Sequence, residues 1–191
     1  ANNYATADLF VDGVDALPGV PYGQGTSISV SAPTTPRSFA VRSAPDTTTI
    51  ASSQLVVANQ GTYALILTQR ASGAGLLVLP DTVSSPPVNS IGLRVINAAP
   101  AAGVVDVYIT GADSTTLTTP VATNIPFEGV MNYKYVGVGT VHVVLTTAGT
   151  KTILLDVNAS QLTAGQVRSV LVIDAAGGEF PLDGLGIPDV G

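Results

Sequence analysis

Hydrophobic and polar residues alternate along most of the chain, in short segments that end at Gly, Pro or Asn. Residues 7–13 (A-D-L-F-V-D-G) place Leu9 and Val11 on one face and Asp8 and Asp12 on the other. A period of two that stops at glycine is typical of a half-buried β-strand followed by a turn. Residues 105–111 (V-D-V-Y-I-T-G) show the same alternation, with Asp, an aromatic residue and Gly in the same places.

The second half of the chain repeats the order of patterns in the first half. We match residues 20–23, 37–41, 60–67 and 79–81 with residues 125–128, 141–145, 164–171 and 180–183. The spacing drifts by a few residues, as loop insertions would produce. Two sets of patterns in the same order predict a duplicated unit of short strands.

Little of the chain has a helical pattern, apart from one possible short turn at residues 159–165. Strands are predicted in the second copy at residues 93–97, 104–110, 127–136, 140–147, 152–157 and 167–174. Many short strands with regularly spaced turn residues are typical of a β-sandwich. We therefore expect a first sandwich at residues 1–82, a Ser/Pro linker at 83–91, a second sandwich at 92–183 and a C-terminal tail at 184–191.

The first copy lacks the strand that opens the second copy. Residues 93–97 are followed by Ala98, Ala99 and Pro100, and the counterpart of Ala99 falls at Ala1. A sandwich without this strand exposes unpaired backbone groups at one edge. One interpretation is that residues 1–6 form a substitute strand, or that the edge is simply short.

The other interpretation is that a neighbouring chain donates an extended segment to this edge, as in β-augmentation. We expect Leu9 and Val11 to mark the acceptor edge. The candidate donors are the linker at residues 83–90 and the tail, through Leu185, Ile187 and Val190. Both donors contain proline, which cannot complete a hydrogen-bond ladder.

Residues 93–100 (L-R-V-I-N-A-A-P), followed by 105–109 (V-D-V-Y-I), resemble a bacterial family known as domain of unknown function 4397. Members of that family carry an R-V-x-N/H-A-x-P segment and then a V-D-V-Y strand. The matching residues here are Arg94, Asn97, Ala98, Pro100, Asp106, Val107 and Tyr108. The resemblance implies secreted or surface-exposed immunoglobulin-like or transthyretin-like sandwiches, often in tandem. Together with the repeat, it predicts an all-β fold of two tandem immunoglobulin-like (Greek-key) β-sandwich domains.

The composition excludes several classes of function. Charged residues make up 10% of the 191 residues, against about 25% in an ordinary soluble domain. The net charge is −6 and the seven Lys and Arg residues are scattered, which disfavours nucleic acid as a partner. No apolar run approaches the roughly 20 residues of a membrane span. Low charge, abundant Thr and an Ala start favour a secreted, cell-surface protein.

Candidate chemistry is sparse. The chain has no Cys, and His142 is its one histidine, which we expect to face solvent from a strand. Asp8, Asp12 and Asp15 surround the Gly13 turn and are weak calcium candidates, because they do not follow a D-x-D-x-D-G loop. We expect Asp106, the counterpart of Asp8, to bond a neighbouring loop or Arg94. The sequence predicts no catalytic residues and no cofactor.

These observations predict a non-enzymatic extracellular structural module. The finer hypothesis is a filament or surface-layer subunit that self-associates by β-strand donation between neighbours. The alternative is a monomeric adhesion module that binds surface proteins or glycans. The aromatic residues that could stack on sugars are Tyr4, Tyr22, Phe127, Tyr133 and Tyr135.

Overall fold

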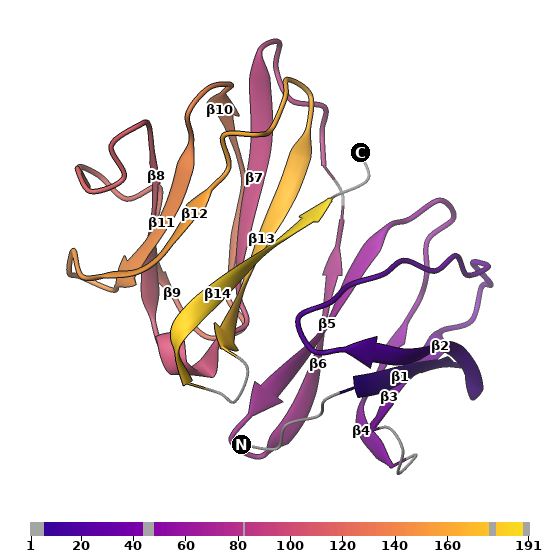
Figure 1. Cartoon of the computed structure of the whole chain (residues 1–191). Coiled ribbons are helices and arrows are strands. Elements are labelled where there is room, and N and C mark those ends of the chain that lie inside the picture. Colours follow the sequence, from indigo (N-terminus) through magenta and orange to yellow (C-terminus); the bar gives the residue numbers. More distant parts are fainter. Residues whose placement is uncertain (1–5, 44–47, 82, 176–178, 189–191) are drawn as a thin grey trace. The chain divides into compact units, whose positions relative to one another are not determined.

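The computed structural model describes residues 6–43, 48–81, 83–175 and 179–188, with the backbone alone at residues 179–183 and 185–188. Regular structure in these residues is β-strand, apart from the 3₁₀ turn η1 (Pro100–Ala102) (Figure 1). The all-β prediction is therefore confirmed. The chain divides into two compact units, unit 1 (Ala1–Thr82) and unit 2 (Val83–Gly191), which are described separately.

Unit 2 contains two four-stranded sheets, of order β10-β7-β13-β14 and β12-β11-β8-β9. Strand β7 pairs with β13 in parallel, and the other neighbours are antiparallel. The strands are β7 (Ser90–Asn97), β8 (Val105–Thr110), β9 (Ala122–Ile125), β10 (Val130–Gly137), β11 (His142–Thr147), β12 (Ile153–Asn158), β13 (Val167–Ala175) and β14 (Glu179–Pro188).

The core of unit 2 lies between its two sheets. Alternate residues of a strand point to the same face, so each apolar alternation contributes one row of core side chains. Strand β7 supplies Ile91, Leu93 and Val95, and β13 supplies Val170 and Val172. The other sheet contributes buried residues that include Val105, Val107, Val143 and Leu145.

Unit 1 has one four-stranded sheet, of order β2-β1-β3-β4, and one two-stranded sheet, β5-β6. Its strands are β1 (Thr6–Val11), β2 (Val14–Pro21), β3 (Arg37–Ser43), β4 (Thr49–Leu55), β5 (Tyr63–Arg70) and β6 (Gly73–Pro80). The order β2-β1-β3-β4 is the order of β9-β8-β11-β12 in unit 2.

The two four-stranded sheets also share their register. Leu9 of β1 lies opposite Val41 of β3, as Val107 of β8 lies opposite Leu145 of β11. Val41 in turn lies opposite Ala51, and Leu145 opposite Leu155. The sequence match of residues 37–41 with 141–145 therefore agrees with the observed pairing.

In the structure, β5 corresponds to β13 with an offset one residue larger than that of the sequence match. Tyr63 pairs with Pro80 at the end of its hairpin, as Arg168 pairs with Pro188. On this register Leu65, which packs against the core of unit 1, corresponds to the core residue Val170. The sequence match set Leu65 against Ser169 instead, and a one-residue slip turns every side chain to the opposite face of the sheet.

Two further sequence predictions differ from the structure. Most of the predicted tail at residues 184–191 belongs to β14, because the backbone of Leu185 pairs with Leu171 and that of Ile187 with Ser169. Residues 159–165 form turns and irregular backbone rather than a helical turn. The sequence did not predict strand β14, because its glycines and prolines interrupt the alternation of apolar and polar residues that is typical of a strand.

Asp106 fastens strand β9 and the turn between β11 and β12 to the start of β8. Its Oδ1 accepts a hydrogen bond from the backbone N–H of Asn124 and its Oδ2 one from that of Gly149, both at 2.8 Å. The residue is 5% exposed. Its counterpart Asp8 is half-buried and accepts one such bond, from Gly19 N–H at 2.6 Å.

We expect Asp106→Ala to lower the free energy of unfolding of unit 2 by roughly 3 kcal/mol, because two backbone N–H groups lose a charged acceptor. The matched variant Asp8→Ala removes a single hydrogen bond, which is more exposed to solvent. It should lower the free energy of unfolding by roughly 1 kcal/mol. Urea denaturation of both variants measures the difference. Equal losses would show that the double bridge of Asp106 has no special weight.

Asp174 of β13 has a pKa raised above 3.8, because burial disfavours its charged form. The N–H of Ala101 donates to its Oδ1 at 3.1 Å and opposes that shift without cancelling it. The folded state therefore holds the proton to higher pH than the unfolded state does. This residue makes unit 2 less stable as the pH rises from below 3.8 through the raised pKa.

Asp174→Asn removes the ionisation and keeps an oxygen that can accept from Ala101. We expect the stability of this variant relative to the wild type to increase as the pH rises from 3 to neutrality. Thermal unfolding across that pH range gives the measurement. A difference that is constant with pH would contradict the burial effect.

Candidate functional site

The most distinctive feature of unit 1 is strand β5, which has one edge that pairs with no described strand. The sheet of unit 2 that contains β13 and β14 also contains β7 and β10, whereas the matching sheet of unit 1 is β5-β6 alone among the described residues (Figure 1). Residues 24–36 occupy the sequence position of β10 without strand pairing, and their Ile28 and Val30 pack against the core. The place of β7 beside β5 holds no described strand.

The backbone groups at this edge follow from the pairing of β5 with β6. Asp81 N–H donates to the carbonyl of Thr62 at 2.8 Å, so these two residues form a hydrogen-bonded pair. Hydrogen-bonded and non-bonded pairs alternate along an antiparallel ladder. Tyr63, Leu65 and Leu67 therefore direct their N–H and C=O groups away from β6. We call residues 63–67 the acceptor edge.

In unit 2, the corresponding side of β13 holds β7. The carbonyl of Val172, the counterpart of Leu67, accepts from Ala98 N–H at 2.9 Å. The carbonyl of Gln166 accepts from Gly92 N–H at the same distance. The side of β13 that binds β7 is thus the side of β5 that faces no described strand.

Among the described residues, the side chains that line the core of unit 1 are less buried than their counterparts in unit 2. In the described part of unit 1, one cluster contains the buried Val11, Phe39 and Val57 with Leu9 and Leu65 half-buried around them, and Val41, Ala51 and Ile66 are buried as well. Val107, the counterpart of Leu9, is 0% exposed in unit 2, where β7 contributes three side chains to the core. Further burial of a half-exposed Leu is worth roughly 1 kcal/mol.

The sequence placed the acceptor edge at Leu9 and Val11, and that location is wrong. Strand β1 lies between β2 and β3 and pairs with both, so it has no free edge. The side chain of Val11 is buried in the core and that of Leu9 is half-buried against it. The missing partner belongs to β5, which the sequence could show only if the parallel pairing of β7 with β13 were known.

The predicted donors lie as follows. The backbone of Leu185 and Ile187 pairs with β13 of the same chain, and Val190 lies outside the described residues. Gly184 of β14 sits so close to β12 that a Cβ on it would lie 2.6 Å from Val157 Cγ2. Strand β14 is therefore an integral part of unit 2. The predicted substitute strand, residues 1–6, lies outside the described residues except for Thr6.

The calcium candidates serve the β1–β2 turn. Asp12 accepts from Ser38 N–H through Oδ1 and forms an ion pair with Arg37 through Oδ2, both at 2.8 Å. Asp8 accepts from Gly19, and Asp15 is exposed on β2. No group of three metal-ligating side chains occurs in the part of the chain that the structure describes. In the structure, Asp8 and Asp12 are thus acceptors for backbone N–H groups of unit 1.

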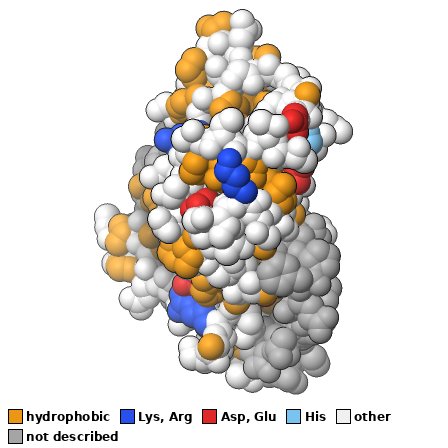
Figure 2. Space-filling model, turned by 90° about the vertical axis from the view of Figure 1, so that its left-hand side faces the viewer, with side chains coloured by type: hydrophobic (Ala, Val, Ile, Leu, Met, Phe, Trp, Pro, Cys, Tyr) orange, Lys and Arg blue, Asp and Glu red, His pale blue; other side chains and the backbone are white. Residues whose placement is uncertain are grey.

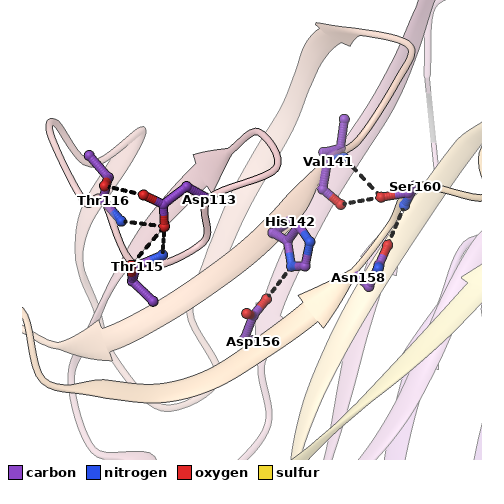
Figure 3. Close-up of polar contacts among 8 residues, drawn as sticks. All are labelled: Asp113, Thr115, Thr116, Val141, His142, Asp156, Asn158 and Ser160. Atoms are coloured by element: carbon purple, nitrogen blue, oxygen red, sulfur yellow. Dashed lines mark hydrogen bonds and ion pairs between the residues drawn. The ribbon is translucent and has the colours of Figure 1, made fainter.

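Figure 3 shows how other polar groups are used. His142 Nδ1 lies 2.7 Å from Asp156 Oδ1 on the neighbouring strand, and its side chain is 17% exposed rather than facing solvent. The Ser160 hydroxyl bonds the backbone of Val141. Hydrogen bonds from the side chains of Thr116 and Thr115 lower the pKa of Asp113. These contacts brace strands and loops.

The aromatic candidates are dispersed. Tyr133 packs its ring against the guanidinium of Arg94, 4.7 Å away, and Tyr135 donates to the Ser84 carbonyl at 2.8 Å. Tyr22 is 50% exposed, and Tyr4 lies outside the described residues. On the face shown in Figure 2, charged side chains are few.

The comparisons with known proteins identify a family and no activity. No helix in the described residues has the length and apolar character needed to cross a membrane. No curated protein matches the chain. The model of one family, "Domain of unknown function (DUF4397)", matches residues 1–108, a span that runs from unit 1 through β7 into β8. This match covers more than half of the chain and confirms the resemblance seen in the sequence, so the chain belongs to the DUF4397 family.

Proposed function

We propose that this protein is a non-enzymatic extracellular structural module whose unit 1 is completed by a β-strand from a neighbouring molecule. Molecules joined in this way build a filament or a surface layer. The observation that carries the proposal is the two-stranded sheet β5-β6, which has four strands in its unit 2 counterpart. β-Augmentation is a general mode of recognition in which an exposed sheet edge binds an extended segment through main-chain hydrogen bonds.

The energies favour such a contact. An added strand that bonds Tyr63, Leu65 and Leu67 gains roughly 1 kcal/mol for each backbone hydrogen bond. Each inward apolar side chain that it buries adds about 1.5–3 kcal/mol. Association costs about 4–15 kcal/mol in lost freedom, and a strand with five or six bonds and three buried side chains gains roughly 10–15 kcal/mol, a stabilisation of the same size.

The non-enzymatic part of the proposal is supported by the use of the polar groups. Asp8, Asp12, Asp106 and Asp113 all accept backbone N–H groups, and His142 pairs with Asp156 across two strands. The extracellular part is supported by the low charge content of 10%. A surface of hydroxyl and small side chains suits a packed structural layer.

Leu67→Pro tests the assembly. Proline removes the N–H that Leu67 directs at the open edge, and it leaves the bonds between β5 and β6 intact. The matched control Leu67→Ala makes a similar side-chain truncation and keeps the N–H. Light scattering after size exclusion, with negative-stain electron microscopy, should show concentration-dependent polymers for the wild type and Leu67→Ala and their loss in Leu67→Pro.

A wild-type protein that stays a monodisperse monomer up to millimolar concentration would contradict the proposal. Polymers that form equally well in Leu67→Pro would contradict the role of the acceptor edge. Circular dichroism of both variants confirms that the chain is folded in the assay.

A further inference from the structure

One side chain of unit 2 has the sequence context and the exposure of an attachment site for carbohydrate. Asn158, the last residue of β12, begins the tripeptide Asn158-Ala159-Ser160. This tripeptide fits N-x-S/T, the acceptor sequence of N-glycosylation, and it is the one match in the sequence. We propose that Asn158 is a glycosylation site, whose side-chain amide carries an oligosaccharide transferred from a lipid-linked donor.

Strand β12 places Asn158 on the solvent side of its sheet. Alternate residues of a strand point to the same face, and β12 packs Leu155 and Val157 against the core of unit 2. Asp156 and Asn158 therefore point outward, and both residues are exposed. Strand β12 also lies at the end of the sheet order β12-β11-β8-β9. An oligosaccharide on Asn158 can thus extend into solvent without displacing a core side chain.

The hydrogen bonds of Asn158 leave its amide nitrogen available. Its Oδ1 accepts a hydrogen bond from Ser160 N–H at 2.8 Å (Figure 3). This bond closes an Asx turn, in which the side-chain oxygen takes the place of a backbone carbonyl. The side chain of Asn158 makes no other hydrogen bond to a described residue. Its Nδ2, the atom to which a sugar is joined, therefore has no protein partner in the described part of the chain.

The transfer reaction balances without an oxidant or a reductant. The donor is an oligosaccharide whose anomeric carbon is bonded to a lipid pyrophosphate, and an oligosaccharyltransferase catalyses the step. Asn158 Nδ2 forms a bond to the anomeric carbon while the bond from that carbon to the pyrophosphate oxygen breaks. The lipid pyrophosphate leaves with the electron pair of the broken bond. The amide proton passes to a base of the transferase.

The hydroxyl of Ser160 is bound to Val141, the residue before β11. Its Oγ accepts from Val141 N–H at 3.1 Å and lies 3.4 Å from the Val141 carbonyl oxygen (Figure 3). A transferase that binds this hydroxyl must first release it from Val141. Such an opening is confined to the end of an edge strand, where local opening costs far less than global unfolding. We therefore expect the transferase to act faster on an opened or unfolded chain than on the folded chain.

Asp156 adds a carboxylate two residues before the acceptor. Side chains at positions i and i+2 of a strand share a face, so this carboxylate lies on the same exposed face as Asn158. In the folded unit its Oδ1 lies 2.7 Å from His142 Nδ1 (Figure 3). An Arg or Lys of the transferase can bind such a carboxylate through charge-assisted hydrogen bonds. Asp156 is thus a recognition residue, and the acceptor atom is Asn158 Nδ2.

Mass spectrometry of the protein isolated from the cells that make it tests the site. Trypsin cuts after Lys151 and Arg168 and releases residues 152–168, in which Asn158 is the one asparagine. We expect this peptide to carry the mass of an oligosaccharide, which fragmentation places on Asn158. Asn59 is also exposed and lacks the N-x-S/T context, so it should stay unmodified. A bare 152–168 peptide, or one with sugar only on its Ser or Thr residues, overturns the proposal.

Reconstituted transfer tests the role of each residue. The purified full chain is incubated with a single-subunit oligosaccharyltransferase and a lipid-linked oligosaccharide, and the gain in mass is followed with time. Asn158→Gln and Ser160→Ala should abolish the transfer, whereas Ser160→Thr keeps the hydroxyl and should retain it. Asp156→Asn preserves the size of the side chain and should slow transfer roughly tenfold, because a charge-assisted contact is lost.

Unfolding of a variant cannot imitate these results. An unfolded chain presents its acceptor sequence more openly, so a variant that merely unfolds would gain transfer, and a loss reports the acceptor sequence itself. Transfer to Asn158→Gln at the wild-type rate overturns the assignment of the acceptor. Equal rates for Asp156→Asn and the wild type overturn the recognition role of the carboxylate.

Discussion

The parallel pairing of β7 with β13 is the contact on which the architecture of unit 2 depends. Strand β7 lies between β10 and β13, and it delivers three side chains to the core. It therefore joins a ladder on each side and fills the space between two sheets. A strand at this place without apolar side chains would leave the core unfilled. Apolar side chains without a strand would leave the edges of β10 and β13 unpaired. One strand satisfies both requirements.

Unit 1 has the same design with no described strand at the place of β7. Its four-stranded sheet has the order and register of its counterpart, so the local folding information is intact. Its second sheet is reduced to one hairpin, and the residues that β7 would cover are half-buried. A hairpin is marginal on its own, and here it is held by packing against β4 and the core. The incomplete part is confined to one side of β5.

Much of the fold could be predicted from the alternation of hydrophobic and polar residues along the sequence. Residues 7–13 and 105–111 are strands that end at glycine turns, and the match of residues 37–41 with 141–145 agrees with the observed register. The missing strand was visible because the repeat is regular. The neighbour of the missing strand in the sheet could not be predicted, because the alternation pattern shows where strands occur and does not show how they pair. The edge was therefore placed on β1, which is central, instead of β5.

Two sequence predictions failed where the alternation of apolar and polar residues is weak: the match of β5 with β13 and the detection of β14. Leu65 and Ser169 both sit in apolar runs, and such runs fit two registers equally well until the buried face is known. The glycines and prolines of β14 hide a strand that the backbone pairing makes plain. Asp106 was expected to bond a neighbouring loop or Arg94, and it bonds Asn124 of strand β9 and Gly149 of a turn 43 positions away.

Amide hydrogen exchange on the unassembled protein tests this account most directly. Ala64 and Ile66 direct their N–H groups to β6, whereas Tyr63, Leu65 and Leu67 direct theirs to the open edge. The account predicts slow exchange at the first pair and fast exchange at the other three in dilute solution, with protection of those three on assembly. In unit 2, Arg168, Val170 and Val172 should be protected at every concentration. Uniform protection along residues 63–67 in a dilute monomer would contradict the account.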